Sequence, residues 1–129
     1  GATSVWTWAN ANYGMKASAY IDKVNIPCVS RLTSPAIDLS KLTEATLSFD
    51  QAINFATDMK SECKVQISTD GKTWEDLEVS GYPAANGWTF VTSTASLNKY
   101  CGKKIYIGFL YTSSSSSAAT WEVKNVSVN

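Results

Sequence analysis

The sequence contains no histidine among its 129 residues. Histidine is the usual general base for serine and cysteine nucleophiles and a common zinc ligand. Its absence therefore excludes Ser-His-Asp and Cys-His catalysis, and histidine-ligated zinc, within this chain. Glycoside hydrolysis needs only a pair of carboxylates, but no pair of acidic residues stands out by its spacing. We therefore expect that this chain is not an enzyme.

The chain also lacks an excess of charge and a long apolar run. It has 11 basic and 11 acidic residues and no basic cluster of the kind that binds nucleic acid. No apolar stretch approaches the roughly 20 residues that span a bilayer. We expect no nucleic-acid partner and no membrane insertion by this domain. Residues 1–4 show no signal-peptide pattern, so we expect one domain over residues 1–129, excised from a longer secreted or lipid-anchored protein.

Cysteines are few and widely spaced: Cys28, Cys63 and Cys101. An odd number allows at most one disulfide and leaves at least one free thiol. A domain of this length buries roughly two thirds of its unfolded surface, so its core does not depend on a disulfide. We interpret the three as buried thiols that pack as small apolar side chains, although one disulfide stays open as the alternative.

What the sequence does contain is a period-two alternation of apolar and polar residues, which is typical of β-strands. It is clearest over the ranges Thr46–Phe55, Cys63–Ser68, Lys103–Thr112 and Trp121–Val128. Turn residues separate these segments at intervals of about 8–12 residues. We therefore predict an all-β fold, a two-sheet antiparallel β-sandwich of about 8–9 strands.

Four local patterns make narrower predictions. Phe55 continues the apolar face of its strand and is expected in the core. The pair Asp70-Gly71 indicates a type I′ hairpin turn. The apolar phase of the last strand slips near Lys124-Asn125, which indicates a β-bulge. One helical turn is expected within Leu39–Ala45.

Several sequence blocks resemble a known family in their order and spacing. They are Tyr13–Tyr20, Arg31–Ser40, Ala45–Asp50, Trp88–Val91, Cys101–Phe109 and Thr120–Val128. Together they resemble the choice-of-anchor J and cleaved-adhesin type domains of Bacteroidetes surface proteins, which are jelly-roll sandwiches similar to MAM domains and galactose-binding-like carbohydrate-binding modules. The resemblance covers nearly the whole chain. It departs at Arg31, where the family usually has tryptophan, and at Lys124, where many relatives have aspartate.

This resemblance implies a jelly-roll topology and binding or cell adhesion in place of catalysis. It also implies an extracellular or cell-surface location, in the context of an outer-membrane lipoprotein. The Lys124 position weakens any transfer of a metal-binding role to that part of the last strand.

Aromatic residues supply the candidate ligand-binding site, because the chain has five tryptophans and six tyrosines. An exposed ring offers an apolar face to sugar C–H groups, and nearby amides orient the sugar hydroxyls. Tyr82 and Trp88 flank a loop of Pro, Gly and Asn residues that contains Asn86. Tyr13 follows a turn, and Trp6 lies in the first predicted strand. We predict these five as ligand-binding residues, with core packing as the alternative for each.

A structural Ca²⁺ ion is the one cofactor that we consider, because jelly-roll modules commonly hold calcium through carboxylates and backbone carbonyls. Asp50, Asp58 and Glu122 are the candidate ligands. No Asp-x-Asp-x-Asp loop is present, and ordinary surface or edge-strand carboxylates are the alternative interpretation.

Two functional hypotheses follow from these residues. The first is a non-catalytic binding or adhesion module of a bacterial surface protein that binds a glycan or a host surface protein. The second is a structural spacer or protein-protein interaction domain without a small-molecule ligand. Exposure of Tyr82, Trp88 and Trp6 on one concave patch would favour the first, and burial of every tryptophan would favour the second.

Overall fold

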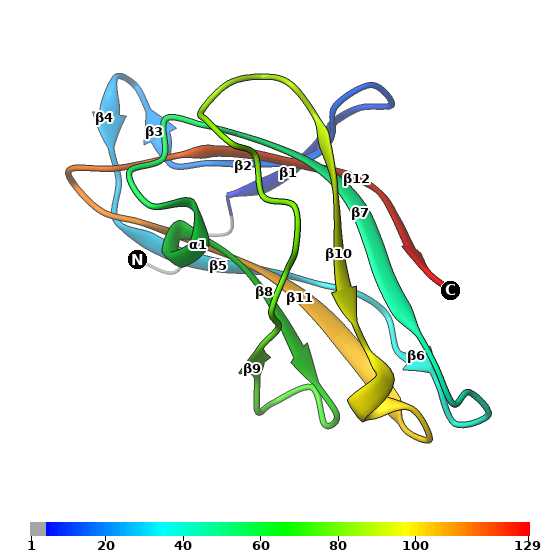
Figure 1. The fold of residues 1–129 in the computed structure, drawn as a ribbon. Coiled ribbons are helices and arrows are strands. Elements are labelled where there is room, and N and C mark those ends of the chain that lie inside the picture. Colours follow the sequence, from blue (N-terminus) through cyan, green and yellow to red (C-terminus); the bar gives the residue numbers. More distant parts are fainter. Residues whose placement is uncertain (1–4) are drawn as a thin grey trace.

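A computed structural model describes residues 5–129 and has the all-β fold that the sequence predicts. Two antiparallel sheets pack against each other as a sandwich (Figure 1). The first sheet has the strand order β1-β2-β12-β7-β10. Their bounds are β1 Trp6–Asn10, β2 Gly14–Ser18, β12 Thr120–Val128, β7 Thr46–Asn54 and β10 Val91–Ser96.

The second sheet has the order β5-β11-β8-β9, and a short strand β6 also pairs with β11. Their bounds are β5 Cys28–Thr33, β11 Lys104–Ser113, β8 Cys63–Ser68, β9 Glu75–Asp76 and β6 Ile37–Asp38. A separate hairpin comprises β3 Tyr20–Ile21 and β4 Val24–Asn25. The helical elements are α1 Met59–Glu62 and a 3₁₀ turn at Asn98–Tyr100. Within residues 5–129 no helix is long and apolar enough to cross a membrane.

The chain path alternates between the two sheets. From β2 onward the longer strands β5, β8 and β11 enter the second sheet, while β7, β10 and β12 return to the first. This alternation is the chain path of a jelly roll. The described residues form twelve strands in place of the expected eight or nine, because β3, β4, β6 and β9 are only two residues long each.

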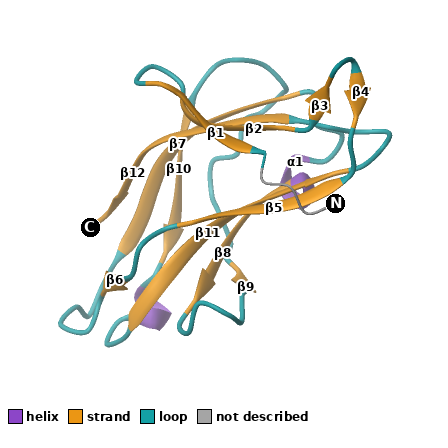
Figure 2. Ribbon diagram, turned by 180° about the vertical axis from the view of Figure 1, so that it is seen from behind, coloured by secondary structure: helices purple, strands orange, loops and turns teal. Residues whose placement is uncertain are grey.

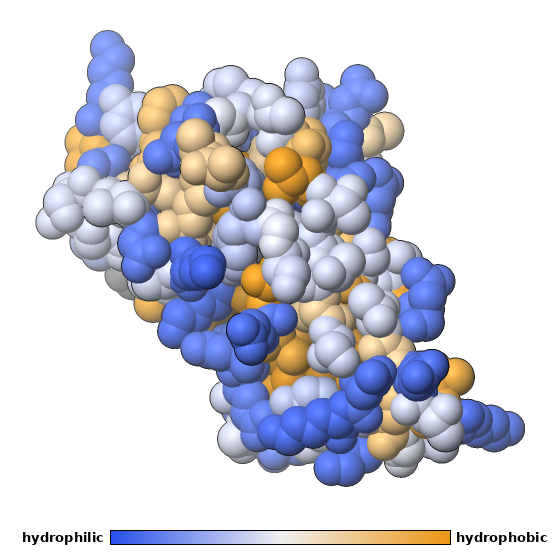
Figure 3. Space-filling view, viewed as in Figure 1, coloured by the Kyte–Doolittle hydropathy of each residue, from blue (hydrophilic) through white to orange (hydrophobic). Residues whose placement is uncertain are grey.

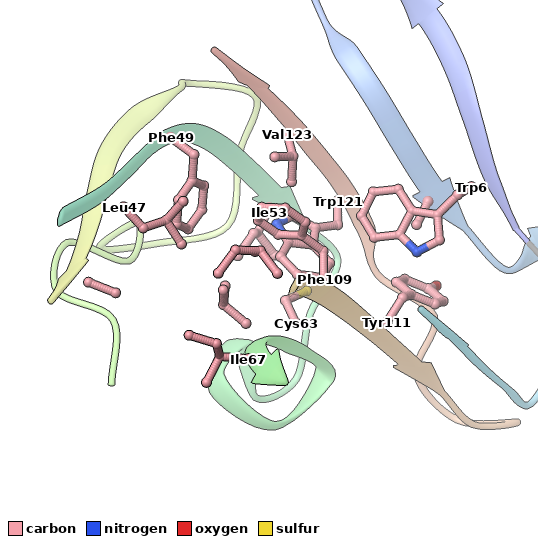
Figure 4. Packing of buried hydrophobic residues seen from close by; sticks show 14 of the residues in the cluster. Trp6, Leu47, Phe49, Ile53, Cys63, Ile67, Phe109, Tyr111, Trp121 and Val123 are labelled. Carbon is pink, nitrogen blue, oxygen red and sulfur yellow. The ribbon is translucent and has the colours of Figure 1, made fainter. Parts of the chain in front are cut away.

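The core lies between the sheets, and four of its aromatic rings contact one another in series (Figure 4). The ring centroids of Trp6 and Trp121 are 5.2 Å apart, and Phe109 lies 5.9 Å from Trp121. Phe109 also meets the edge of Phe49 at 5.3 Å. Tilted and edge-to-face contacts of this kind add to the energy of apolar burial. The alternation predicted over Lys103–Thr112 is confirmed, since the alternate residues Ile105, Ile107, Phe109 and Tyr111 are all buried.

A buried polar chain crosses this core without an unpaired member. The indole Nε1 of Trp121 donates to Oε1 of Gln51 at 2.9 Å, and Nε2 of Gln51 donates to Oγ of Ser93 at 2.9 Å. Ser93 in turn donates to the carbonyl of Gly81 at 2.9 Å. Each donor of this polar chain therefore has an acceptor. Its last hydrogen bond holds Gly81, at the start of the 81–90 loop, against Ser93 of β10.

Two of the local predictions have opposite outcomes. The bulge is confirmed: pairing of β12 with β7 changes register between Lys124 and Ser127, and Asn125 has a φ of 54°. The helical turn expected within Leu39–Ala45 is wrong, because that segment contains only a turn in which Leu42 N–H donates to Leu39 O. The short helix is instead α1.

The type I′ turn at Asp70-Gly71 is also wrong. Type I′ geometry needs a positive φ at both central residues, but of the two only Gly71 has one, at 76°. Residues 69–74 form a longer loop, in which Oδ1 of Asp70 accepts from the backbone N–H groups of Lys72 and Thr73. These hydrogen bonds lower the pKa of the Asp70 carboxyl.

The three cysteines are free thiols. Cys28 and Cys63 are buried, as expected, whereas Cys101 is only half-buried. Burial raises the pKa of the Cys63 thiol, which makes it inert as a nucleophile.

Candidate functional site

A cleft of about 420 Å³ lies at one end of the sandwich. Three chain segments meet there: the β3–β4 hairpin, the segment between β7 and α1, and the loop between β11 and β12 (Figures 1 and 2). We call this hollow the end cleft. It is lined by Tyr20, Asn25, Phe55, Thr57, Ser116, Ser117, Ala118 and Thr120.

Phe55 is the most unusual residue of the end cleft. It directly follows β7, its side chain is 63% exposed, and its φ is 62°. A positive φ is rare for a bulky side chain and costs about 1–2 kcal/mol relative to ordinary backbone. Asn54 supports this geometry because its Oδ1 accepts the Phe55 N–H at 2.9 Å. The chain thus turns the ring out of the core and toward solvent.

The loop at 81–90 holds this geometry in place. Asn86 accepts the N–H of Ala56 at 2.8 Å and donates to the carbonyl of Ala56 at 2.9 Å. The same loop presents Trp88, which is 56% exposed and meets Phe55 edge to face, with 5.9 Å between ring centroids. Strained backbone conformations that several neighbouring contacts hold in place cluster at functional sites.

Tyr111, on β11, holds together two of the chain segments that line the end cleft. Its buried hydroxyl donates to Ala119 O at 2.7 Å and accepts the N–H of Ala19 at 3.0 Å. These two residues immediately precede Thr120 and Tyr20, which both line the cleft. Burial raises the pKa of Tyr111 to about 12, so the hydroxyl keeps its proton at neutral pH. Two cleft segments far apart in sequence are therefore held by one side chain.

The carboxylate of Glu62 ties the segment between β7 and α1 to the loop between β11 and β12. Glu62 is 9% exposed, and its Oε2 accepts from the backbone N–H groups of Thr57, at 2.8 Å, and Asp58. Its Oε1 accepts from Oγ of Ser117 at 2.6 Å, and Thr57 Oγ1 donates to the same Ser117 oxygen at 3.0 Å. The positions of Thr57 and Ser117 are thus fixed before any ligand arrives.

Apolar side chains surround the cleft as well as line it. Tyr20, on the hairpin, is 56% exposed, and its neighbours Ile21, Val24 and Ile26 are exposed too. Figure 3 shows apolar surface at the upper left, over the end of the sandwich where Figure 1 draws β3 and β4. Exposed apolar side chains that gather beside a cleft are typical of a binding surface.

The structure brings two of the five predicted ligand-binding residues to the edge of this cleft. Trp88 is exposed beside Phe55, and Asn86 acts as the clamp on Ala56. Tyr82 is only partly exposed and packs against the core, with its hydroxyl donating to Cys63 O at 2.6 Å. Burial raises the pKa of Tyr82, consistent with a structural role.

Trp6 and Tyr13 lie elsewhere. Trp6 is 8% exposed and donates from Nε1 to Ser30 O, so its prediction as a ligand-binding residue is wrong: its side chain belongs to the core. Tyr13 is 48% exposed, but it precedes β2 whereas Tyr20 follows it. With roughly 3.4 Å per residue, the strand separates them, and Tyr13 is not in the end cleft.

The three carboxylates predicted to bind calcium do not converge. Asp50 accepts from Asn125 Nδ2 at 2.9 Å and from Thr92 Oγ1 at 2.7 Å, and both hydrogen bonds lower its pKa. Asp58 is the N-cap residue of α1. Glu122 is 5% exposed, one of its oxygens has no hydrogen-bond partner, and burial raises its pKa. Among residues 5–129, no group of three His, Cys, Asp or Glu side chains could hold a metal ion.

The sequence prediction missed Phe55, Tyr20 and the serines of the cleft. Phe55 was expected on the core face because it continues the alternation of β7, and that expectation is wrong. No periodicity signals the change, because the left-handed backbone begins only at Phe55, after the strand ends. The adjacent Asn54 is the only local signal, since its side chain can bond the next N–H group.

Comparison with known proteins adds no relatives: no protein-family model matches the chain, and no curated protein matches it. The geometry of the end cleft therefore carries the functional assignment.

Proposed function

We propose that this chain is a non-catalytic glycan-binding module, with the end cleft as its binding site. The observation that carries the proposal is Phe55, which is held in a strained backbone conformation and exposed at the cleft beside Trp88. A strain of this kind persists only where surrounding contacts maintain it. The side chain gains little from burial in return, so its exposure is best explained by a ligand.

The chemistry of the cleft matches the two sides of a sugar ring. The face of an aromatic ring carries partial negative charge and attracts the partly positive C–H groups of a pyranose. Phe55 and Tyr20 supply such rings, while Asn25, Thr57 and Ser116 supply polar groups beside them. The cleft volume of about 420 Å³ lies in the usual range of roughly 300–1,000 Å³ for small-ligand sites.

The biological setting is proposed from the sequence resemblance. A jelly roll that resembles choice-of-anchor J domains fits a secreted or cell-surface adhesion module of a bacterial protein, in which glycan binding anchors the parent chain. The absence of histidine supports binding in place of triad catalysis.

A glycan array probed with the wild-type domain tests the proposal. We expect binding to at least one glycan, with a loss of about tenfold or more, or 1.4 kcal/mol, in Phe55→Ala and in Trp88→Ala. Trp8→Ala and Tyr13→Ala are the matched controls, because each removes an exposed ring, 65% and 48% exposed, that neither lines the cleft nor packs against Phe55 as Trp88 does. Silence of the wild type on every glycan, or equal losses in the controls, would refute the assignment.

A protein-binding module is the second candidate, and the hairpin favours it. Ile21 and Val24 project apolar side chains into solvent next to the cleft, and such side chains contribute to protein interfaces. Adhesion of domain-coated beads to enzymatically deglycosylated cells, lost in Ile21→Glu, would support this candidate. Adhesion that disappears on deglycosylation would support the glycan.

A further inference from the structure

We propose that the end cleft selects uncharged sugar units and rejects acidic ones, through a hydroxyl chain that runs from Thr57 to Glu62. This inference rests on the proposed glycan-binding function and adds its specificity. It depends on which atom donates in the hydrogen bonds between Thr57 and Ser117 and between Ser117 and Glu62.

The carboxylate of Glu62 fixes which atom donates. Its two oxygens accept from three donors: the backbone N–H groups of Thr57 and Asp58 on Oε2, and the hydroxyl of Ser117 on Oε1. An ionised carboxylate has no proton to donate. The bond between Ser117 and Glu62, at 2.6 Å, is therefore donated by Ser117, and it is short because the acceptor is charged.

The donor in the hydrogen bond between Thr57 and Ser117 is fixed as a consequence. Because the Ser117 hydroxyl proton points at Glu62, the Ser117 oxygen can only accept from Thr57, at 3.0 Å. The backbone N–H of Ser117 is also occupied, because it donates to Oγ of Ser114 at 3.1 Å. Both hydroxyl protons of the Thr57–Ser117 pair are thus used inside the protein, and the pair can offer a ligand only lone pairs.

Thr57 and Ser117 both line the end cleft, whereas Glu62 lines a neighbouring hollow of about 290 Å³ on their other side. The two hydroxyls therefore form a wall between the ligand and the carboxylate. A ligand group that meets this wall must donate a hydrogen bond. Sugar hydroxyls can do so, whereas an ionised carboxylate or sulfate cannot.

Charge acts in the same direction as hydrogen bonding. None of the eight described residues that line the cleft is charged, so no cation there pairs with an acidic sugar. Asp58 and Glu62 line the hollow behind the wall, and the buried carboxylate of Glu62 repels an anion in the cleft. An acidic group placed against this wall would lose hydration without gaining a hydrogen bond from Thr57 or Ser117.

The test compares oligosaccharides that end in a hexose with those that end in the corresponding hexuronic acid, by isothermal titration calorimetry. For the wild type we expect the hexuronic acid to bind at least about tenfold more weakly, a difference of roughly 1.4 kcal/mol. Thr57→Val keeps the shape but removes the acceptor, and we expect it to weaken hexose binding about tenfold. Thr57→Ser keeps the hydroxyl and is the matched control, with binding close to wild type.

Glu62→Gln tests the charge directly. Its amide can donate to Ser117 and reverse the chain, so that Thr57 offers a proton to the ligand. We expect the preference for hexose over hexuronic acid to shrink several-fold in this variant. Thermal unfolding of each variant verifies that it remains folded at the assay temperature.

The outcomes separate the inference from the function on which it rests. A wild type that binds hexose and hexuronic acid equally, or a folded Thr57→Val that binds hexose as well as Thr57→Ser, overturns the inference and leaves glycan binding standing. A wild type that binds no glycan overturns both.

Discussion

Replacing Phe55 by glycine and by alanine tests whether its backbone is strained. Both substitutions remove the same ring and the same contact with Trp88, so their difference reports the backbone alone. At a φ of 62°, alanine retains the penalty of about 1–2 kcal/mol that a Cβ brings in this region. Glycine avoids that penalty but loses roughly 0.5–1 kcal/mol more conformational entropy on folding.

The balance predicts that Phe55→Gly is more stable than Phe55→Ala by about 0.5–1 kcal/mol. For a domain of this size the midpoint of thermal unfolding should differ by about 2–4 °C. Chemical denaturation followed by tryptophan fluorescence gives the free energy of unfolding of both variants. Both should lose glycan binding to the same extent, since neither has the ring.

Thr7, an exposed position within β1, provides the reference pair. At its ordinary strand backbone, Thr7→Ala should be more stable than Thr7→Gly, which is the reverse order. If alanine is equal to or better than glycine at position 55, the backbone is not strained there. The main reason for assigning the site to Phe55 would then disappear.

Two further predictions concern buried ionisable groups. Glu122 has one unpaired buried oxygen and a raised pKa, so the folded state holds its proton more tightly than the unfolded state. The contribution of Glu122 to the free energy of unfolding should therefore rise as the pH falls from neutral toward the unfolded pKa of about 4.5. Glu122→Gln should add about 1 kcal/mol at neutral pH and remove that pH dependence, and urea unfolding at several pH values checks both, with a loss of stability on substitution as the contrary result. Tyr111→Phe should lower the free energy of unfolding by at least about 2 kcal/mol, because it leaves Ala19 N–H and Ala119 O without partners. With its pKa raised to about 12 against about 10 when unfolded, Tyr111 contributes stability that is lost as the pH rises above about 10. The difference in free energy of unfolding between wild type and Tyr111→Phe should therefore shrink above that pH, and a difference that stays constant would contradict this origin.

The architecture could be predicted from the sequence because it depends on local alternation. The faces of β8 and β11 follow from period-two patterns in which nearly every core residue is a large apolar side chain. The bulge in β12 could be predicted for the same reason, since one extra residue moves Val126 and Val128 out of phase with Trp121.

The end cleft could not be predicted in this way because its parts come from three distant segments. Tyr20, Phe55 and Ser117 meet only through the sandwich topology and through hydrogen bonds from Tyr111 and Glu62. Whether the ring of Tyr82 faces solvent or the core could not be predicted either, because the course of the 81–90 loop decides it. A loop aromatic alone carries no such information.

The most direct measurement is a map of amide chemical shifts on titration of the isotope-labelled domain with the best glycan from the array. We predict that the largest shifts occur at Phe55, Thr57 and Ser116–Ala118, with the indole signal of Trp88 shifting and that of Trp8 unchanged. Shifts centred on the outer faces of the sheets or on the turn at Tyr13, with the end cleft silent, would contradict the proposed site.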